Sequence, residues 1–63
     1  MKEFRITFET EKLDVYNMCE LVKYATAQKC DISFDAMNVL MHIDCDCRVC
    51  CLLLRSYKEL YGA

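Results

Sequence analysis

Seven consecutive residues, CDCRVCC at positions 45–51, contain four of the six cysteines in this 63-residue chain. Cysteine thiolates are ligands for zinc and for Cu(I). Cys47 and Cys50 have the C-x2-C spacing of many zinc sites, and His42 lies three residues before Cys45. One interpretation is therefore a metal site formed by Cys45, Cys47, Cys50 and His42, with Zn or Cu(I) as the ion.

The same cysteines fit a second interpretation, in which they pack inside the protein as small apolar side chains. A structural zinc site takes four ligands, usually from two separated pairs, and a second pair is missing here. Cys19, Cys30 and His42 are the only remote candidates for further ligands. Free cysteine is also among the most frequently buried residue types. If the last helix starts near Asp44, Cys45 aligns with Val49 on its inner face. We favour this packing interpretation, which requires no cofactor.

The residues around the cluster do not favour catalysis. A catalytic cysteine needs a lowered pKa and a nearby base. Asp44 and Asp46 flank Cys45 and oppose that lowering, and His42 is the only candidate base. The sequence has no glycine-rich phosphate loop, no G-x-S-x-G and no paired-carboxylate pattern. We therefore expect that the protein is not an enzyme.

The first half of the chain predicts a strand followed by a helix. Apolar and polar residues alternate over Lys2–Glu9, which is typical of a half-buried strand. Asp14 suits a helix N-cap, because its carboxylate can accept a free backbone N–H of the first turn. Residues 15–28 then show helical periodicity. The expected inner face consists of Val15, Met18, Cys19, Val22, Ala25 and Thr26, with Leu21 at its edge.

The second half predicts a hairpin and a second helix. Residues 30–34 alternate as a strand, Asp35–Asn38 is the expected turn, and Val39–Ile43 is a short apolar strand. Asp44 or Asp46 then caps the last helix. The expected inner stripe of that helix is Val49, Leu52, Leu53, Ser56 and Leu60.

These elements predict one small α+β domain over residues 1–63, with the order β-α-β-β-α. A three-stranded sheet, antiparallel or mixed, should carry both helices on one face. Gly62 is expected to end the last helix, at a position that favours a left-handed residue.

The outer side of the last helix is the expected interface. A strip that includes apolar residues falls on this face, which should be exposed to water. Apolar surface often marks an interaction site, and a chain this short benefits from a partner. We therefore expect a protein partner, a homodimer, or both. The strip consists of Cys47, Cys51, Leu54, Lys58 and Tyr61.

Composition narrows the classes of partner and location. The chain is 56% apolar with a formal charge of −2, and its basic residues are interleaved with acids. Such a pattern does not predict nucleic-acid binding. The longest apolar run, Val49–Leu54, is far too short to cross a membrane, and the N-terminus has no signal-peptide core. We expect a cytoplasmic protein, in a bacterium or a host cell, with reduced thiols.

Three stretches, KEFRITFE, VYNMCELVKYATAQ and CDISFDAMNVLMHIDCDCRVCCLLL, together resemble the HPr-like phosphocarrier family over residues 2–54. The resemblance implies an α+β fold and a regulatory role. Members carry a phosphorylated histidine at the start of the first helix, where this chain reads TEKLDVYNM. The family's regulatory serine falls on Cys45. Its fourth strand, which lies between the first two, has no counterpart, so either the first strand pairs differently or another chain fills the gap.

Together these features predict a small non-catalytic module that binds a protein. An inhibitor that acts by covering a partner's surface, of the phage anti-CRISPR or anti-defence type, fits the size of the chain. A thiol-rich metal-binding protein and an HPr-like regulator without the phosphocarrier histidine are the two alternatives.

Overall fold

The computed structural model describes residues 2–61. Strand β1 (Phe4–Glu9) leads through a short 3-10 turn, η1 (Thr10–Lys12), into helix α1 (Val15–Ala27). Strands β2 (Asp31–Asp35) and β3 (Leu40–Cys45) follow, and helix α2 (Arg48–Tyr61) comes last. The predicted α+β class and β-α-β-β-α order are confirmed. Gly62, the expected end of the last helix, lies outside the described residues.

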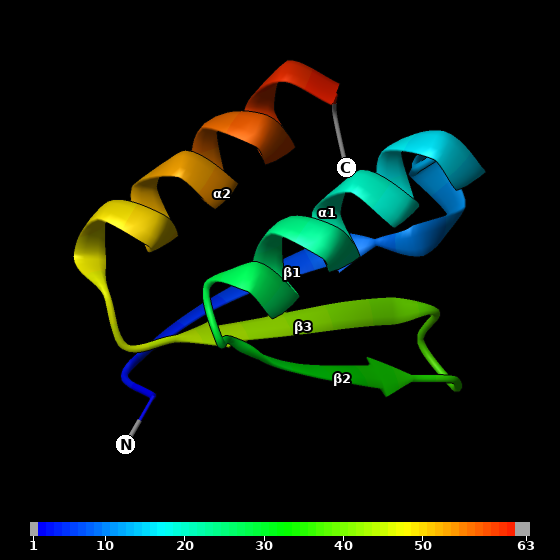
Figure 1. Ribbon diagram of the computed structural model, residues 1–63. Coiled ribbons are helices and arrows are strands. Elements are labelled where there is room, and N and C mark those ends of the chain that lie inside the picture. The colour runs from blue at the N-terminus through cyan, green and yellow to red at the C-terminus, as the bar shows by residue number, and fades with distance from the viewer. Residues whose placement is uncertain (1, 62–63) are drawn as a thin grey trace.

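The three strands form one antiparallel sheet in the order β1-β3-β2. Strand β3 is central, so β1 and β2 are the two edges and run parallel to each other without pairing. Both helices lie over the same face of the sheet, as Figure 1 shows, which confirms the predicted layers. Strand β1 pairs directly with β3. The structure therefore shows a first strand that pairs differently from the HPr-like arrangement, and not a gap that another chain would fill.

The core lies between the sheet and the helices. Ile6 is paired with Ile43 and Phe8 with Met41, and all four side chains are at most 5% exposed. Their alternation along β1 and β3 is the period of two that the sequence of the first strand predicts. Helices α1 and α2 close this core from above. They contribute the buried residues Leu21, Ala25, Cys50, Cys51 and Leu54.

The other face of the sheet is polar. Arg5 and Asp44 are cross-strand partners, and the Arg5 guanidinium binds the carboxylate through Nε–Oδ1 at 2.7 Å and Nη2–Oδ2 at 3.1 Å. One pair further along, Thr7 Oγ1 lies 2.9 Å from His42 Nδ1. Residues of alternating polarity therefore put one face of β1 and β3 in the core and leave the other in contact with water.

Helix α1 begins and ends with capping interactions. The Asp14 carboxylate accepts the Asn17 backbone N–H at 2.7 Å, so the predicted N-cap is confirmed. At the other end, the N–H of Lys29 donates to Thr26 O at 3.0 Å and that of Cys30 to Ala25 O at 2.9 Å. This pair of bonds is a Schellman motif. Lys29 has the left-handed φ of 60° that the motif requires.

The β2–β3 hairpin has the predicted turn and a longer second strand. Asp35 Oδ1 accepts the backbone N–H groups of Met37 and Asn38 at 3.1 and 3.2 Å, which is the role expected of an aspartate in a turn. Strand β3 begins at Leu40 rather than Val39 and continues to Cys45. Cys45 is therefore a strand residue, and the prediction that it belongs to the last helix is wrong.

The predicted orientation of the last helix is also wrong. Its inner side carries Cys50, Cys51 and Leu54, which are 1–4% exposed. The physical reason is that Val49–Leu54 is apolar on every side, so the periodicity of this stretch does not distinguish an inner face. The predicted inner face of the helix was aligned on Cys45, which belongs to strand β3 and not to the helix. All five residues of the expected inner stripe are exposed: Val49, Leu52, Leu53, Ser56 and Leu60.

The inner face of α1 was predicted in part. Ala25 is fully buried, and Met18 and Val22 pack against the core as expected. Val15 is 80% exposed, and Cys19 and Thr26 are exposed as well, so these three assignments are wrong. Val15 is the first residue of the helix and lies at its solvent-facing end. Leu21, which the periodicity placed at the edge, is instead 2% exposed.

Among residues 2–61, no helix combines the length and the apolar character needed to cross a membrane.

Candidate functional site

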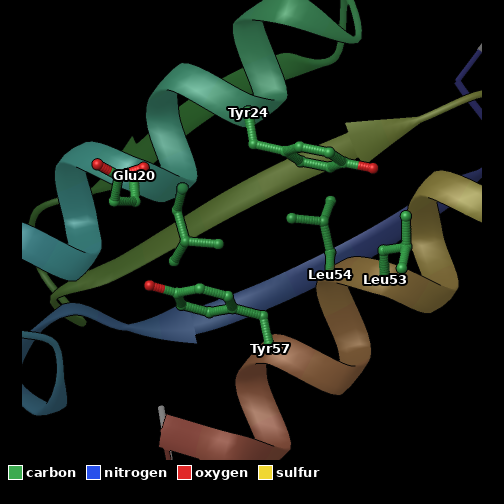
Figure 2. Close-up of a pocket in the computed structure, with 6 residues that line it drawn as sticks. Glu20, Tyr24, Leu53, Leu54 and Tyr57 are labelled. Atoms are coloured by element: carbon green, nitrogen blue, oxygen red, sulfur yellow. The ribbon is translucent and has the colours of Figure 1, made fainter.

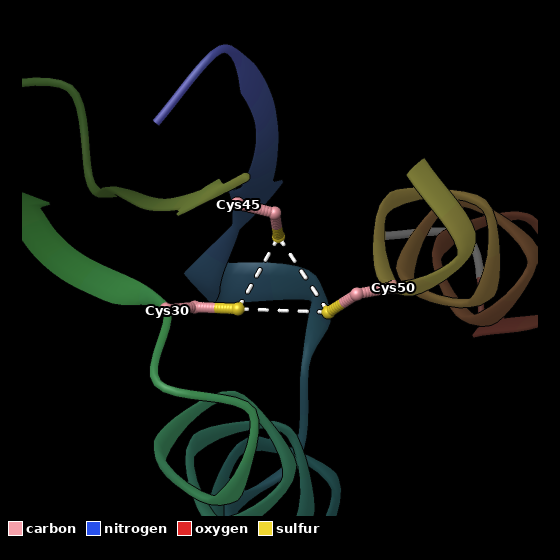
Figure 3. A group of neighbouring side chains, drawn as sticks. All are labelled: Cys30, Cys45 and Cys50. Carbon is pink, nitrogen blue, oxygen red and sulfur yellow. Dashed lines mark hydrogen bonds between the residues drawn. The ribbon is translucent and has the colours of Figure 1, made fainter. Parts of the chain in front are cut away.

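Three cysteine sulfurs meet at one end of the core. Cys30 Sγ lies 3.3 Å from Cys45 Sγ and 3.5 Å from Cys50 Sγ, and the third side of the triangle, Cys45–Cys50, measures 3.7 Å. Figure 3 shows the three side chains pointing toward one another. All three are free cysteines. We call this group the thiol triangle.

Three different elements position the thiol triangle. Cys30 follows the Schellman motif that ends α1, and its own N–H is fixed to Ala25 O. Cys45 is the last residue of β3 and faces the core, opposite Phe4 of β1. Cys50 lies in the first turn of α2 and points back toward the sheet. The sulfurs therefore come together only when the helices and the sheet have assembled.

Burial dominates the electrostatics of the triangle. Burial raises the pKa of the Cys45 thiol far above its ordinary value, and the neighbouring Cys30 and Cys50 thiols add to the effect. The pKa of Cys30 is also raised, chiefly by burial, although Cys45 and the nearby Lys2 ammonium act in the opposite direction. At this site the thiolate form therefore requires a bound group, such as a metal ion, that takes the place of the thiol protons.

The positively charged side chain of Lys2 lies beside the triangle. Lys2 Nζ donates to the Lys29 carbonyl at 2.8 Å and forms an ion pair with Asp46 at 3.4 Å. These contacts hold the chain before β1 against the loop that carries Cys30. Tyr24 is a further neighbour: burial raises the pKa of its hydroxyl, and Cys50 and the two other thiols contribute in the same direction.

The predicted metal ligands do not all come together. Cys45 and Cys50 belong to the triangle, but Cys47 is exposed. His42 lies on the polar face of the sheet beside Thr7, because it is an odd number of residues from Cys45 in the same strand. The set Cys45, Cys47, Cys50 and His42 is therefore corrected. Cys30, one of the remote candidates named from the sequence, takes part instead.

A second feature is the apolar surface on α2. Val49 is 64%, Leu52 48%, Leu53 54% and Leu60 78% exposed. Leu52, Leu53 and Leu60 follow Val49 by three, four and eleven residues, a spacing that places all four along one side of the helix. We call these four residues the α2 stripe. It lies opposite the side that packs on the sheet.

The residues predicted to form the interface lie elsewhere. Cys51 and Leu54 are 4% and 1% exposed, so the expectation that they form an outer strip is wrong. Lys58 is half-buried, and Tyr61 packs against Tyr57 with ring centroids 4.5 Å apart. Of the five predicted residues, only Cys47 and Tyr61 are exposed. The apolar surface that the sequence predicted for this helix exists, but on its opposite side.

A groove separates the two helices beside the α2 stripe. Figure 2 shows Tyr24 on α1 and Leu54 and Tyr57 on α2 directed into it. Its volume is about 300 Å³. The Tyr57 hydroxyl donates to Asn17 Oδ1 at 3.0 Å, which joins the helices at one end. Leu53 lines both the groove and the stripe, so the two form a continuous apolar surface.

Comparison of the chain with protein-family models, with curated proteins and with solved structures finds no match in any of the three. The geometry of the thiol triangle and of the α2 stripe therefore carries the functional argument.

Proposed function

We propose that the protein is a non-catalytic module that binds another protein through the α2 stripe. The observation that carries this proposal is the exposure of four large aliphatic side chains on one side of a single helix. Isolated apolar residues are common on protein surfaces, but a contiguous group of this kind marks an interaction site. Covering the stripe removes apolar area from water and so stabilises a complex.

The charges beside the stripe indicate the chemistry of the partner. Arg48 and Arg55 are exposed and lie on either side of Leu52 along the helix. Within residues 2–61, neither arginine forms an ion pair. Acids border the stripe as well, since Glu20 lines the groove with Leu53 and Glu59 is exposed next to Leu60. The matching surface is therefore apolar at its centre, with a rim of mixed charge that places acids opposite the two arginines, because opposite charges at a rim favour encounter and orientation.

The mode of action in this proposal is occlusion. A helix face presented on a small, folded domain can cover a groove or a flat apolar surface on a larger protein. Inhibition of a partner, in the manner of a phage anti-CRISPR or anti-defence protein, is the specific form that the size of the chain supports. Homodimerisation through the same stripe is the other form, in which the partner is a second copy.

The test compares three forms of the tagged protein: the native sequence, the double variant Leu53→Asp with Leu60→Asp, and the control variant Met37→Asp. Met37 is 94% exposed at the hairpin turn, so the control adds an acid to an apolar surface residue far from α2. We expect the native and control forms to recover the same partner protein. The double variant should recover at least about tenfold less of it, as is typical when centrally placed contacts are substituted.

Sedimentation across a dilution series distinguishes the two forms of the proposal. A dimer that the double variant abolishes and the control retains would identify the partner as a second copy. A monomer that captures one protein in the stripe-dependent manner would identify a foreign partner. Equal recovery by all three forms, with no dimer, would show that the α2 stripe is not a binding surface. Circular dichroism confirms that each variant is folded.

A further inference from the structure

We propose that Cys30, Cys45 and Cys50 form a three-thiolate site for a Cu(I) ion. The proposal does not depend on the α2 stripe, which is on the outer side of the helix. Its basis is the convergence on one point of three cysteine side chains, from the loop after α1, from β3 and from α2. Thiolate is the ligand that a soft ion such as Cu(I) prefers.

The spacing of the sulfurs suits a single metal ion. For metal–sulfur bonds of about 2.3 Å, three sulfurs in a plane around one ion are about 4.0 Å apart. The observed separations are 3.3, 3.5 and 3.7 Å. A movement of each sulfur by a few tenths of an ångström therefore accommodates the ion. Rotation about the Cα–Cβ bonds supplies this movement without rearranging the backbone.

The number of ligands favours Cu(I) over zinc. Zinc takes four ligands in structural sites. Within residues 2–61, no fourth Cys, His, Asp or Glu offers a ligand atom within 4.8 Å of all three sulfurs. Cys51 follows Cys50 directly and is buried, but it does not join the group. A soft monovalent ion with three thiolates therefore matches the triangle better than a divalent ion that needs a fourth ligand.

The surroundings allow the ion to enter and offset the charge of the complex. Cys45 and Cys50 are buried, whereas Cys30 is only half-buried and gives access from solvent. Three thiolates and one Cu(I) carry a net negative charge. The Lys2 ammonium lies beside Cys30 and stabilises that charge by attraction. Binding of the ion displaces the thiol protons, which are released to solvent.

Anaerobic titration tests the site. Reduced protein is mixed with Cu(I) held by a chromogenic chelator, and the loss of the chelate absorbance measures transfer of the ion. We expect uptake of one Cu(I) per chain, and X-ray absorption of the loaded protein should report sulfur ligands only. The variant Cys50→Ala should bind Cu(I) at least about 100-fold more weakly, since a direct ligand matters at least as much as its second-sphere partners do.

The matched control is Cys51→Ala. Cys50 and Cys51 are adjacent and are 3% and 4% exposed, so the two substitutions remove a similar amount of buried sulfur. Cys51→Ala should retain uptake, as should the double variant of the exposed cysteines, Cys19→Ala with Cys47→Ala. Cys30→Ser, at the half-buried corner, is a second test of the triangle should Cys50→Ala fail to fold.

Three results would overturn the proposal. They are no uptake by the native protein, equal loss of uptake in the Cys50→Ala and Cys51→Ala variants, and tight binding of Zn(II) with no transfer of Cu(I). The third result would mean that the site binds zinc, with a fourth ligand from outside the triangle. None of the three affects capture of a partner by the α2 stripe, so the two proposals fail separately.

Discussion

Lys29 is the residue that turns the chain from α1 toward the thiol triangle. Its φ of 60° is in the left-handed region, where a side chain with a Cβ atom is strained. The two hydrogen bonds of the Schellman motif hold it there. Glycine is the usual residue at this position because it lacks the Cβ atom. The sequence has lysine instead, so helix α1 ends at some cost in stability.

Replacing Lys29 by glycine should stabilise the protein. We expect Lys29→Gly to raise the free energy of unfolding by roughly 0.5–1 kcal/mol, because relief of backbone strain exceeds the added freedom of the unfolded chain. Urea unfolding measures the change. The control is Lys23→Gly, an exposed position inside α1, where the same substitution should lower stability by about 1 kcal/mol. Destabilisation by both variants would contradict the strain at Lys29.

At the scale of elements, the orientation of α2 has the clearest energetic consequence. Leu54 is 1% exposed and packs on the sheet, whereas its neighbour Leu53 is 54% exposed. Leu54→Ala should therefore cost about 2–5 kcal/mol, the loss typical of a buried leucine, and leave the domain close to unfolding. Leu53→Ala should change stability by no more than about 0.5 kcal/mol.

Chemical denaturation of both variants, followed by circular dichroism, measures this difference. Equal losses for Leu53→Ala and Leu54→Ala would mean that the helix does not present one side to the sheet. A larger loss for Leu53→Ala would restore the orientation expected from the sequence, with Leu53 on the inner side.

Local signals in the sequence are sufficient to predict several elements of the fold. Strand β1 was predicted correctly in type and in its end, although it begins at Phe4 rather than Lys2, because polar and apolar residues alternate without exception from Phe4 to Glu9. The start of α1 and the hairpin turn were predicted because Asp14 and Asp35 bond to the backbone within three residues. Each of these signals is local, so the sequence contains all that is needed to interpret it.

The orientation of α2 and the membership of the thiol triangle depend on contacts between distant residues. Val49–Leu54 is apolar on every side, and only packing against β1 and β3 selects the buried side. Cys30 joins Cys45 and Cys50 because α1, the sheet and α2 are assembled around one point. Sequence spacing groups Cys45 and Cys50 in one short stretch. Cys30 lies fifteen residues before Cys45, and only the folded structure selects it over the other remote candidates, such as the exposed Cys19.

At the scale of the whole molecule, acid should destabilise the fold. The pKa of Asp44 lies below its usual value because it accepts hydrogen bonds from Arg5, and that of Asp35 is lowered by the side chain and N–H of Asn38. The pKa of Glu9 is lowered by Lys12. A carboxyl with a lowered folded pKa stabilises the protein above its unfolded pKa, near 4, and loses this contribution as pH falls through the folded pKa.

Unfolding in urea at a series of pH values tests this expectation. The free energy of unfolding should be steady near neutral pH and should decline below about pH 4, where these carboxylates take up protons. The variant Asp44→Asn should show a shallower decline, because one of the three groups no longer titrates. The same slope in the variant and the native protein would show that the Arg5–Asp44 pair makes no contribution.

The place of β1 in the sheet has a consequence for the order of events in folding. Strands β2 and β3 are joined by a short turn, but β1 pairs with β3 across the whole of α1 and β2, with Phe4 opposite Cys45. Closing that long loop costs more chain entropy than forming the hairpin. The hairpin should therefore form first and offer β3 as a template. During synthesis, β1 emerges first and remains without its partner until the central strand has been made.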